Sequence, residues 1–376
     1  MAFLPASRRP VASSLFLLLR RLSSAPSVPH PAFDPEIRRL ARLRRFTDIE
    51  SLLEPLKKDR SHASSEPFLA SVVASYASSG MIDHALRTLD ELPRLGSPRT
   101  AVSLNALLSA LNHSPHRFGR RRLVPELFDS LSRKLSIAPD AVSYGLLIKS
   151  HCLAGQTKKA LPILKEIEEK KIEVNTVIYT TILDSLYKEN KPEVAQRLWT
   201  EMNTKGIKPD LPAYNVRVMY RALHGKPKEV LDLISEIEAE GLKPDTITYN
   251  YLIACYCTHG KFGDAKKVYK ELEEKGCVPN SATYKILVSA LCKNGDFDGS
   301  LDIFADSLKR SKVPDLSSMK LLVEGLVKTS KLRAAKRVVN GLKNKFPEDF
   351  AGEWKKLESM VELNTDKVGS DGMMTN

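Results

Sequence analysis

The sequence lacks the residue patterns that mark most enzymes and metal proteins. It contains no P-loop, no nucleophile elbow, no paired-glycine cofactor fingerprint and no C-x-x-C pair. The H-x-E and P-C-x-x-C motifs of zinc deaminases are also absent. The eight histidines are scattered, and we interpret His113 and His116, in the irregular stretch 112–122, as part of a surface loop. We therefore expect no enzyme activity, no metal and no cofactor.

Long hydrophobic runs are missing as well. No stretch approaches the roughly 20 apolar residues that a membrane-spanning helix needs, and the run Leu15–Leu19 is far too short. We therefore expect no membrane partner. The formal charge is +13 and the sequence pI is about 9.4, a balance that favours nucleic acid or another anionic partner.

Acidic residues are absent before Asp34, whereas Arg8, Arg9, Arg20 and Arg21 stand among serines. This composition is typical of an organellar transit peptide. The segment 20–23, Arg-Arg-Leu-Ser, resembles the arginine-minus-three cleavage pattern of mitochondrial presequences. We therefore expect a transit peptide at 1–22 and a mitochondrial location, with the chloroplast as the alternative.

A secretory signal with Leu15–Leu19 as its core is the competing interpretation, and the cysteines argue against it. There are five of them, and Cys152, Cys257 and Cys292 recur at the twelfth position of the repeat described below. We therefore interpret them as small apolar residues on helices and not as a disulfide framework.

A repeat of 35 residues fills the centre of the chain. It is marked by tyrosines at evenly spaced positions: Tyr144, Tyr179, Tyr214, Tyr249 and Tyr284. If each unit begins three residues before its tyrosine, the gapless units are 141–175, 176–210, 211–245, 246–280 and 281–315. A glycine, or Asn190, recurs at the fifteenth position, and a proline recurs at the thirty-fourth from Pro209 onward.

Each unit has the apolar pattern of two amphipathic helices. In the unit 246–280, apolar residues follow the spacing i, i+3, i+4, i+7, i+8 from Tyr249 to Cys257. Gly260 then permits a turn, and a second apolar face runs from Phe262 to Leu272. A hairpin this short cannot bury both faces alone, so neighbouring units must stack. The sequence predicts an all-α fold built as an α-solenoid.

This pattern resembles the pentatricopeptide repeat, and in particular its pure 35-residue P class. The resemblance rests on the opening 247–250, Ile-Thr-Tyr-Asn, and on the close 241–245, Gly-Leu-Lys-Pro-Asp. It implies a right-handed superhelix of helix-turn-helix repeats. It extends loosely to 101–140, giving six repeats over 101–315, with degenerate repeats at 31–100 and 316–350, and a capping helix and polar tail at 351–376.

The resemblance also implies that each unit reads one RNA base with two residues, its fifth and its last. The pairs are Asn105 with Asp140, Gly145 with Asn175, Thr180 with Asp210, Asn215 with Asp245, Asn250 with Asn280, and Lys285 with Asp315. In the family's code Asn with Asp favours U, Thr with Asp favours G, and Asn with Asn favours C or U. Gly145 and Lys285 match no standard combination, so the expected target is U-n-G-U-Y-n.

Two further sets of residues complete the expected RNA site. By resemblance, the second residue of each unit sandwiches the bases by apolar contact: Val102, Val142, Val177, Pro212, Ile247 and Ala282. Lys188, Lys293 and Lys328 recur at the thirteenth position, where an ammonium at the end of a helix can reach the phosphate backbone. The alternative for these lysines is a solvated surface.

The base-reading residues have structural interpretations too. Asp or Asn directly before a helix is also what an N-cap looks like, and the two roles can coexist. Asn105, Asn215 and Asn250 could instead hydrogen-bond a neighbouring repeat. The tyrosines are expected in the core and not as base-stacking platforms.

The unit 211–245 departs from the pattern. Arg217 takes a position that is apolar in the other units. Val218, Met219, Ala222 and Leu223 indicate a one-residue slip of the apolar face there.

The favoured hypothesis is a sequence-selective single-stranded RNA-binding protein. It would act on organellar transcripts by occupancy, in stabilisation, processing, splicing or translation. The first alternative is a structural protein of the mitochondrial ribosome, whose basic charge meets ribosomal RNA without base reading. A protein-binding scaffold is the second.

Overall fold

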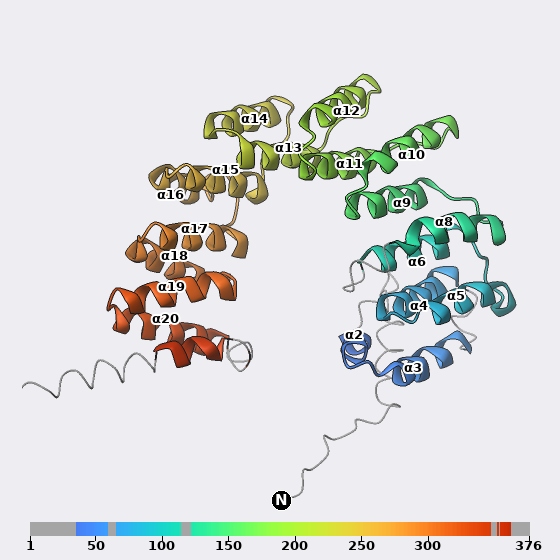
Figure 1. The fold of residues 1–376 in the computed structure, drawn as a ribbon, viewed down its shortest axis with the longest axis horizontal. Helices are drawn as coiled ribbons and strands as arrows, with labels where there is room; N and C mark the ends of the chain where they lie inside the picture. Colours follow the sequence, from blue (N-terminus) through green and yellow to red (C-terminus); the bar gives the residue numbers. More distant parts are fainter. Residues whose placement is uncertain (1–34, 59–64, 114–121, 347–351, 353, 362–376) are drawn as a thin grey trace, which may run out of the picture. The chain divides into compact units, whose positions relative to one another are not determined.

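The computed structural model describes residues 35–58, 65–113, 122–346, 352 and 354–361. The expected transit peptide, the polar tail and His116 lie outside these residues. The described chain forms two compact units, Met1–Lys208 and Pro209–Asn376. All of its elements in the described ranges are helices, which confirms the predicted all-α fold (Figure 1).

The first unit is a series of helical hairpins. Helices contact their neighbours along the chain, and α4, α6, α9 and α11 also pack on one another in order. The helices are α2 (Pro35–Arg42), α3 (Phe46–Lys58), α4 (Glu66–Ser79), α5 (Ile82–Glu91), the 3-10 helix η2 (Leu92–Leu95), α6 (Ala101–His113), α8 (Leu123–Lys134), α9 (Ala141–Leu153), α10 (Thr157–Glu169), α11 (Thr176–Lys188) and α12 (Pro192–Thr204).

The second unit repeats the same arrangement. Its first helices α13, α15, α17 and α19 pack on one another in order, and each of α14, α16 and α18 packs on its own first helix and on the next one. The helices are α13 (Leu211–His224), α14 (Pro227–Ala239), α15 (Thr246–Thr258), α16 (Phe262–Glu271), α17 (Ser281–Lys293), α18 (Phe297–Lys309), α19 (Leu316–Lys328) and α20 (Leu332–Lys345). A short helix follows at 355–361, with Leu357 and Val361 buried.

The turn inside most of the hairpins contains a residue in the left-handed conformation, whereas Gly225, in the unit 211–245, is extended with a φ of −111°. Gly260 takes a φ of 69° after α15, and Asn190 takes a φ of 53° at the equivalent place after α11. Asparagine tolerates this conformation better than most residues. The one unit without a glycine at its fifteenth position therefore keeps the same turn.

The register tyrosines lie in the core, as expected. Tyr179 and Tyr284 are fully buried, and Tyr144 is 2% exposed. The hydroxyl of Tyr284 on α17 donates to Asp306 on α18 at 2.9 Å, and the hydroxyl of Tyr144 on α9 donates to Glu166 on α10 at 3.2 Å. Tyr144 and Tyr284 are thus core residues whose hydroxyls also join the two helices of their own hairpin.

The predicted one-residue slip in the unit 211–245 is wrong. Tyr214 and Val218 are buried as in a regular unit, whereas Leu223 is 69% exposed. Arg217 stays in register because its guanidinium lies 2.8 Å from Glu236 on α14 and over the ring of Tyr214. A charged residue is tolerated at an apolar position here because a partner from the second helix reaches it.

Candidate nucleic-acid interface

The last residue of each unit begins the next unit's first helix. Asp140, Asn175, Asp210, Asp245, Asn280 and Asp315 are the N-caps of α9, α11, α13, α15, α17 and α19, and each side chain accepts a hydrogen bond from the third backbone N–H of its helix. In the first of these caps the N–H of Ser143 lies 2.8 Å from Asp140 Oδ1. The N-cap interpretation is therefore confirmed.

Four of the six predicted base-reading pairs are in direct contact. In each, the fifth residue donates to the side chain that closes its unit. The distances are 3.0 Å from Asn105 Nδ2 to Asp140 Oδ1, 3.2 Å from Asn215 Nδ2 to Asp245 Oδ1, 3.3 Å from Asn250 Nδ2 to Asn280 Oδ1, and 2.7 Å from Lys285 Nζ to Asp315 Oδ2. The expectation that these asparagines could bond a neighbouring repeat is also confirmed, because each partner caps the next hairpin.

Two hydroxyls that sequence reasoning missed orient the amides of Asn105 and Asn215. Ser143 Oγ donates to Asn105 Oδ1 at 2.6 Å, and Thr248 Oγ1 donates to Asn215 Oδ1 at 2.7 Å. Since the hydroxyl holds the amide oxygen and the carboxylate holds the amide nitrogen, the orientation of the amide is set by two partners. The signal was present, because Ser or Thr recurs just before the register position at 143, 248, 283 and 318.

Replacing Thr248 by valine should lower the free energy of unfolding by about 1–2 kcal/mol. The buried hydroxyl accepts from the backbone N–H of Asp245 at 3.2 Å as well as donating to Asn215, so valine leaves both groups without a partner. Urea denaturation measures the loss. Thr248→Ser keeps the hydroxyl and should retain most of the stability; equal stability of the two variants would contradict this role.

The electrostatics of the closing carboxylates follow from these contacts. The ammonium of Lys285, followed by the hydroxyl of Ser318, lowers the pKa of Asp315 to about 2. Partial burial opposes ionisation of Asp140, yet the hydrogen bonds from Ser143 and Asn105 keep the pKa of its carboxyl below the ordinary value. Both groups are therefore anionic acceptors at neutral pH.

The other two pairs differ for local reasons. Gly145 has no side chain to offer, although a Cβ built there would meet only Ile178, at 3.6 Å. Thr180 lies on α11 of the first unit and Asp210 in the second. The oxygen Oγ1 of Thr180, like Oδ1 of Asn250, is buried without a hydrogen-bond partner among the described residues. Such an atom costs about 1–3 kcal/mol, which a ligand that bonds it would recover.

The second residues of the units form a matching apolar series. All six predicted base-sandwiching residues are exposed, with Val177 at 65% and Val142 at 57%. A single exposed valine needs no explanation, but exposure at the same register in every unit indicates a common role. They lie in the first turn of the first helices, three residues before the fifth position of each unit.

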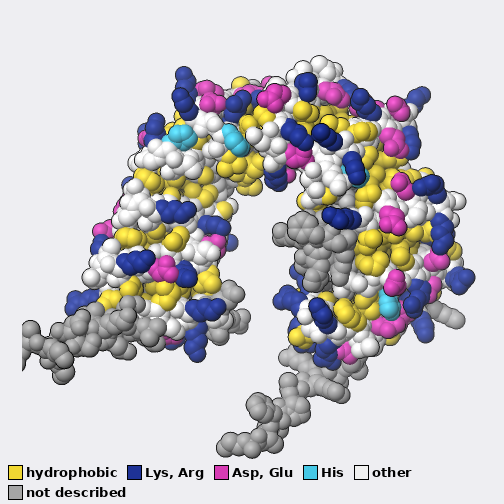
Figure 2. Space-filling model, in the orientation of Figure 1, with side chains coloured by type: hydrophobic (Ala, Val, Ile, Leu, Met, Phe, Trp, Pro, Cys, Tyr) yellow, Lys and Arg dark blue, Asp and Glu magenta, His cyan; other side chains and the backbone are white. Residues whose placement is uncertain are grey.

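The predicted phosphate lysines are at helix ends. Lys188, Lys293 and Lys328 are exposed and lie in the last turns of α11, α17 and α19. Lys188 is paired with Asp184 at 2.6 Å. Basic side chains elsewhere are interspersed with acidic ones over the visible surface (Figure 2). No cluster of three or more His, Cys, Asp or Glu that could hold a metal occurs within the described ranges.

Three sequence profiles match the chain. The PPR repeat family matches 174–218 and 244–293, the pentatricopeptide repeat domain matches 126–184, and the PPR repeat matches 70–97 and 282–311. The chain belongs to the pentatricopeptide repeat family. No helix in the described part of this pentatricopeptide repeat protein is long and apolar enough to cross a membrane.

Similar curated proteins occur in Arabidopsis thaliana. The small ribosomal subunit protein mL103 (rPPR7) is 45% identical over 198 residues, which cover 52% of this chain and 47% of that protein. A mitochondrial pentatricopeptide repeat-containing protein is 43% identical over 201 residues, 53% of this chain and 47% of that one. The small ribosomal subunit protein mS78 (rPPR3a) is 39% identical over 139 residues, 37% of this chain and 33% of that protein. The chain thus spans about half the length, or less, of these relatives.

Solved structures show the same fold. The crystal structure of PPR10 from maize matches with a TM-score of 0.51 at 18% identity, over 85% of this chain and 48% of that one. PPR10 in complex with an 18-nt psaJ RNA element matches with a TM-score of 0.50 at 16% identity, over 89% of this chain and 52% of that one. The pentatricopeptide repeat protein described here is therefore an α-solenoid.

Proposed function

We propose that this protein is a sequence-selective single-stranded RNA-binding protein, of the P class, that reads one base per repeat. The observation that carries the proposal is the row of fifth and last residues joined by hydrogen bonds or an ion pair at four of six units. PPR10, which shares the fold, is the protein whose structure was solved with an RNA element. The chain would act by occupancy and not by catalysis, in stabilisation, processing, splicing or translation of organellar transcripts.

The paired side chains have capacity left for a base. In the pair Asn105 with Asp140, the amide nitrogen uses one of its two hydrogens on the carboxylate, and the amide oxygen accepts one hydrogen bond from Ser143. One donor and one acceptor site of the amide remain. A pyrimidine edge presents a complementary donor and acceptor, and a base with the wrong edge would leave polar groups unpaired. The exposed valines at the second position would hold the base plane between them.

The proposed target is U-n-G-U-Y-n, and the third base gives the sharpest test. Changing Thr180→Asn should move the preference at that base from G towards U, because an amide replaces a single hydroxyl at the fifth position of the repeat that Asp210 closes. Selection from a randomised RNA pool, with wild type and variant in parallel, measures the shift. Thr181→Asn, one residue further along α11, is the matched control and should leave the preference unchanged. A selection that enriches no sequence, or no shift at the third base, would refute base reading.

A structural role in the mitochondrial ribosome is the second candidate. It is supported by the relatives mL103 and mS78, which are named as small ribosomal subunit proteins and share 45% and 39% identity with this chain. It is also supported by the two pairs, at Gly145 and Lys285, that match no standard code. Sedimentation separates the candidates. Co-migration with ribosomal subunits through high salt favours the ribosomal role, and release into transcript-bound particles favours the first proposal.

We propose the mitochondrion as the location, in preference to the chloroplast. The arginine-rich and serine-rich segment 1–22 supports an organellar transit peptide. A relative with 43% identity is named mitochondrial, whereas one named chloroplastic is 28% identical. Fluorescence imaging of the full chain fused to a reporter at its carboxyl end, beside markers for both organelles, tests the assignment.

A further inference from the structure

The second helix α20 differs from the other second helices in charge. It carries five basic residues and no acidic one: Arg333, Lys336, Arg337, Lys343 and Lys345. The neighbouring α18 has three aspartates and one lysine, and α14 has four acidic residues and one lysine. Arg333, Lys336 and Arg337 are exposed and lie within one and a half turns, so they share one face of the helix.

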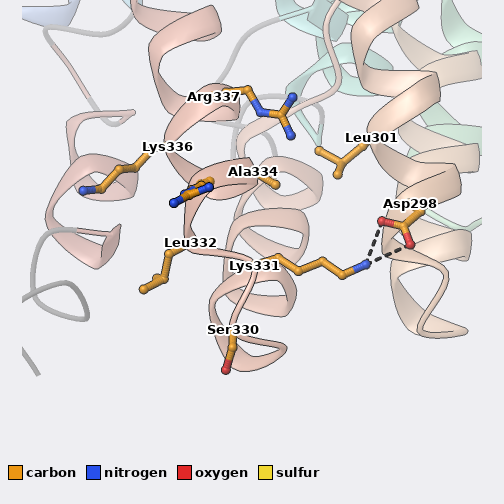
Figure 3. A pocket seen from close by; sticks show the side chains of 9 residues that line it. Asp298, Leu301, Ser330, Lys331, Leu332, Ala334, Lys336 and Arg337 are labelled. Carbon is orange, nitrogen blue, oxygen red and sulfur yellow. Dashed lines mark hydrogen bonds and ion pairs between the residues drawn. The ribbon is translucent and has the colours of Figure 1, made fainter. Parts of the chain in front are cut away.

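A groove runs beside this face. It has a volume of about 590 Å³ and is lined by Asp298 and Leu301 of α18 and by residues from Ser330 to Arg337. Lys331 reaches across it to Asp298, at 2.7 and 2.8 Å from the two carboxylate oxygens (Figure 3). Asp298 is the one acidic residue in this lining, and its charge is met by Lys331.

The remaining cations of the groove have no acidic partner among the described residues. Arg333, Lys336 and Arg337 take part in none of the ion pairs there, whereas Lys343 is paired with Glu358. Arg337 extends towards Leu301, and Lys336 points the opposite way (Figure 3). The helix therefore presents uncompensated positive charge on both sides of its exposed face.

We propose that the exposed face of α20 and the groove beside α18 bind the phosphate backbone of RNA, on the 3′ side of the bases read by 101–315. This rests on the proposed function, single-stranded RNA binding. Arginine suits the role because its planar fork matches a phosphate. The hairpin α19/α20 follows the last reading unit directly, so RNA running 5′ to 3′ along the repeats would leave that unit towards it.

The surface fits RNA better than it fits a membrane. A helix that lies on a lipid surface needs large apolar side chains on the side that enters the lipid. None of the large hydrophobic residues exposed in the described chain lies on α20. The contact would be independent of sequence, because phosphates carry no base identity.

The test is a triple variant with a matched control. Arg333, Lys336 and Arg337 are changed to Gln together, and the control changes Lys158, Lys159 and Lys165 of α10 to Gln. The control residues are exposed on a second helix as well, but α10 also carries three glutamates. Exposed substitutions of this kind change stability by less than about 0.5 kcal/mol, and circular dichroism checks the fold.

Binding is measured by fluorescence anisotropy with the U-n-G-U-Y-n core alone, and with an oligoadenosine extension on its 3′ or its 5′ end. The triple variant should bind the 3′-extended RNA at least about 10-fold more weakly than wild type does. The slope of the logarithm of the binding constant against the logarithm of the salt concentration should be shallower by about 2. For the core alone and the 5′-extended RNA, variant and wild type should agree within about 2-fold, as should the control on all three probes.

Equal binding of the 3′-extended RNA by wild type and triple variant would overturn the proposal. An equal loss of affinity for the 3′-extended and the 5′-extended RNA would also overturn it. Polyglutamate serves as a model of an acidic protein. If the triple variant lost binding to polyglutamate but not to RNA, the partner would be an acidic protein. Failure of the base code is a separate result, because it would abolish the preference for the core over a scrambled core while the triple variant still lost affinity for the 3′ extension.

Discussion

Replacing Tyr284 by alanine is expected to lower the free energy of unfolding by about 3–5 kcal/mol. The ring is fully buried and lies edge-on to Tyr269, with 6.1 Å between the ring centroids. Its loss leaves a cavity between stacked helices. It also removes one of the donors to Asp306, which bonds Tyr269, Tyr284 and Arg310 together. Urea denaturation followed by circular dichroism measures the effect as a lower midpoint.

Tyr284→Phe is the control for this prediction. It keeps the ring and removes the hydroxyl, so it should cost about 1 kcal/mol. At a temperature where the Tyr284→Ala variant is still folded, that variant should keep the base preference of the units that lie far from 281–315. A loss of base preference in every unit with unchanged stability would show that the tyrosine contacts RNA and does not act through packing.

The double change Gly145→Asn and Lys285→Asn should give the largest gain in RNA binding, with affinity rising by about 10- to 100-fold. At position 285 the new amide would face Asp315, with Ser318 behind it, as Asn105 faces Asp140 with Ser143 behind it. At position 145 a side chain finds room, since the nearest atom to an added Cβ is 3.6 Å away on Ile178. The selected sequence should change from U-n-G-U-Y-n to U-Y-G-U-Y-U.

Gly145→Ala with Lys285→Ala is the matched control, because it removes the lysine without adding an amide. It should leave the second and sixth bases unselected. The pKa of Asp315 should rise from about 2 towards its ordinary value in both variants, since both lose the ammonium that lowers it. An alanine control that selects the same sequence as the asparagine variant would contradict the pairing.

The elements that could be predicted from the sequence are those that local residues determine. The spacing of Tyr144 and its equivalents placed the first helices, and Asp or Asn after proline marked where they begin. The contacts of Asn105 and Asn215 with the next hairpin were foreseen only as alternatives, because they depend on how hairpins stack. Nothing in the periodicity could show that Glu236 reaches Arg217 from the second helix.

The cationic groove at α20 could not be predicted from the sequence. The composition of 332–345 is visible in the sequence, but a run of basic residues is usually a solvated face. Only the packing of α20 beside α18 shows that Lys331 forms an ion pair with Asp298. Arg333 and Arg337 are then left without an acidic partner in the described chain. Charge balance in a stacked repeat is decided between neighbouring units, not within one.

The closing residue of each unit limits how such a protein can acquire a new target. Under the proposed function, a substitution at Asp245 would change a base preference and would also remove the N-cap side chain of α15. Loss of an N-cap costs about 1 kcal/mol, and this cost recurs at every unit that is altered. Only short polar side chains can both cap the next helix and contribute to base recognition, so few residue types are suitable at the last position. Divergence of specificity between duplicated copies should therefore accumulate at the fifth position, where Asn, Thr, Gly and Lys already occur in this one chain.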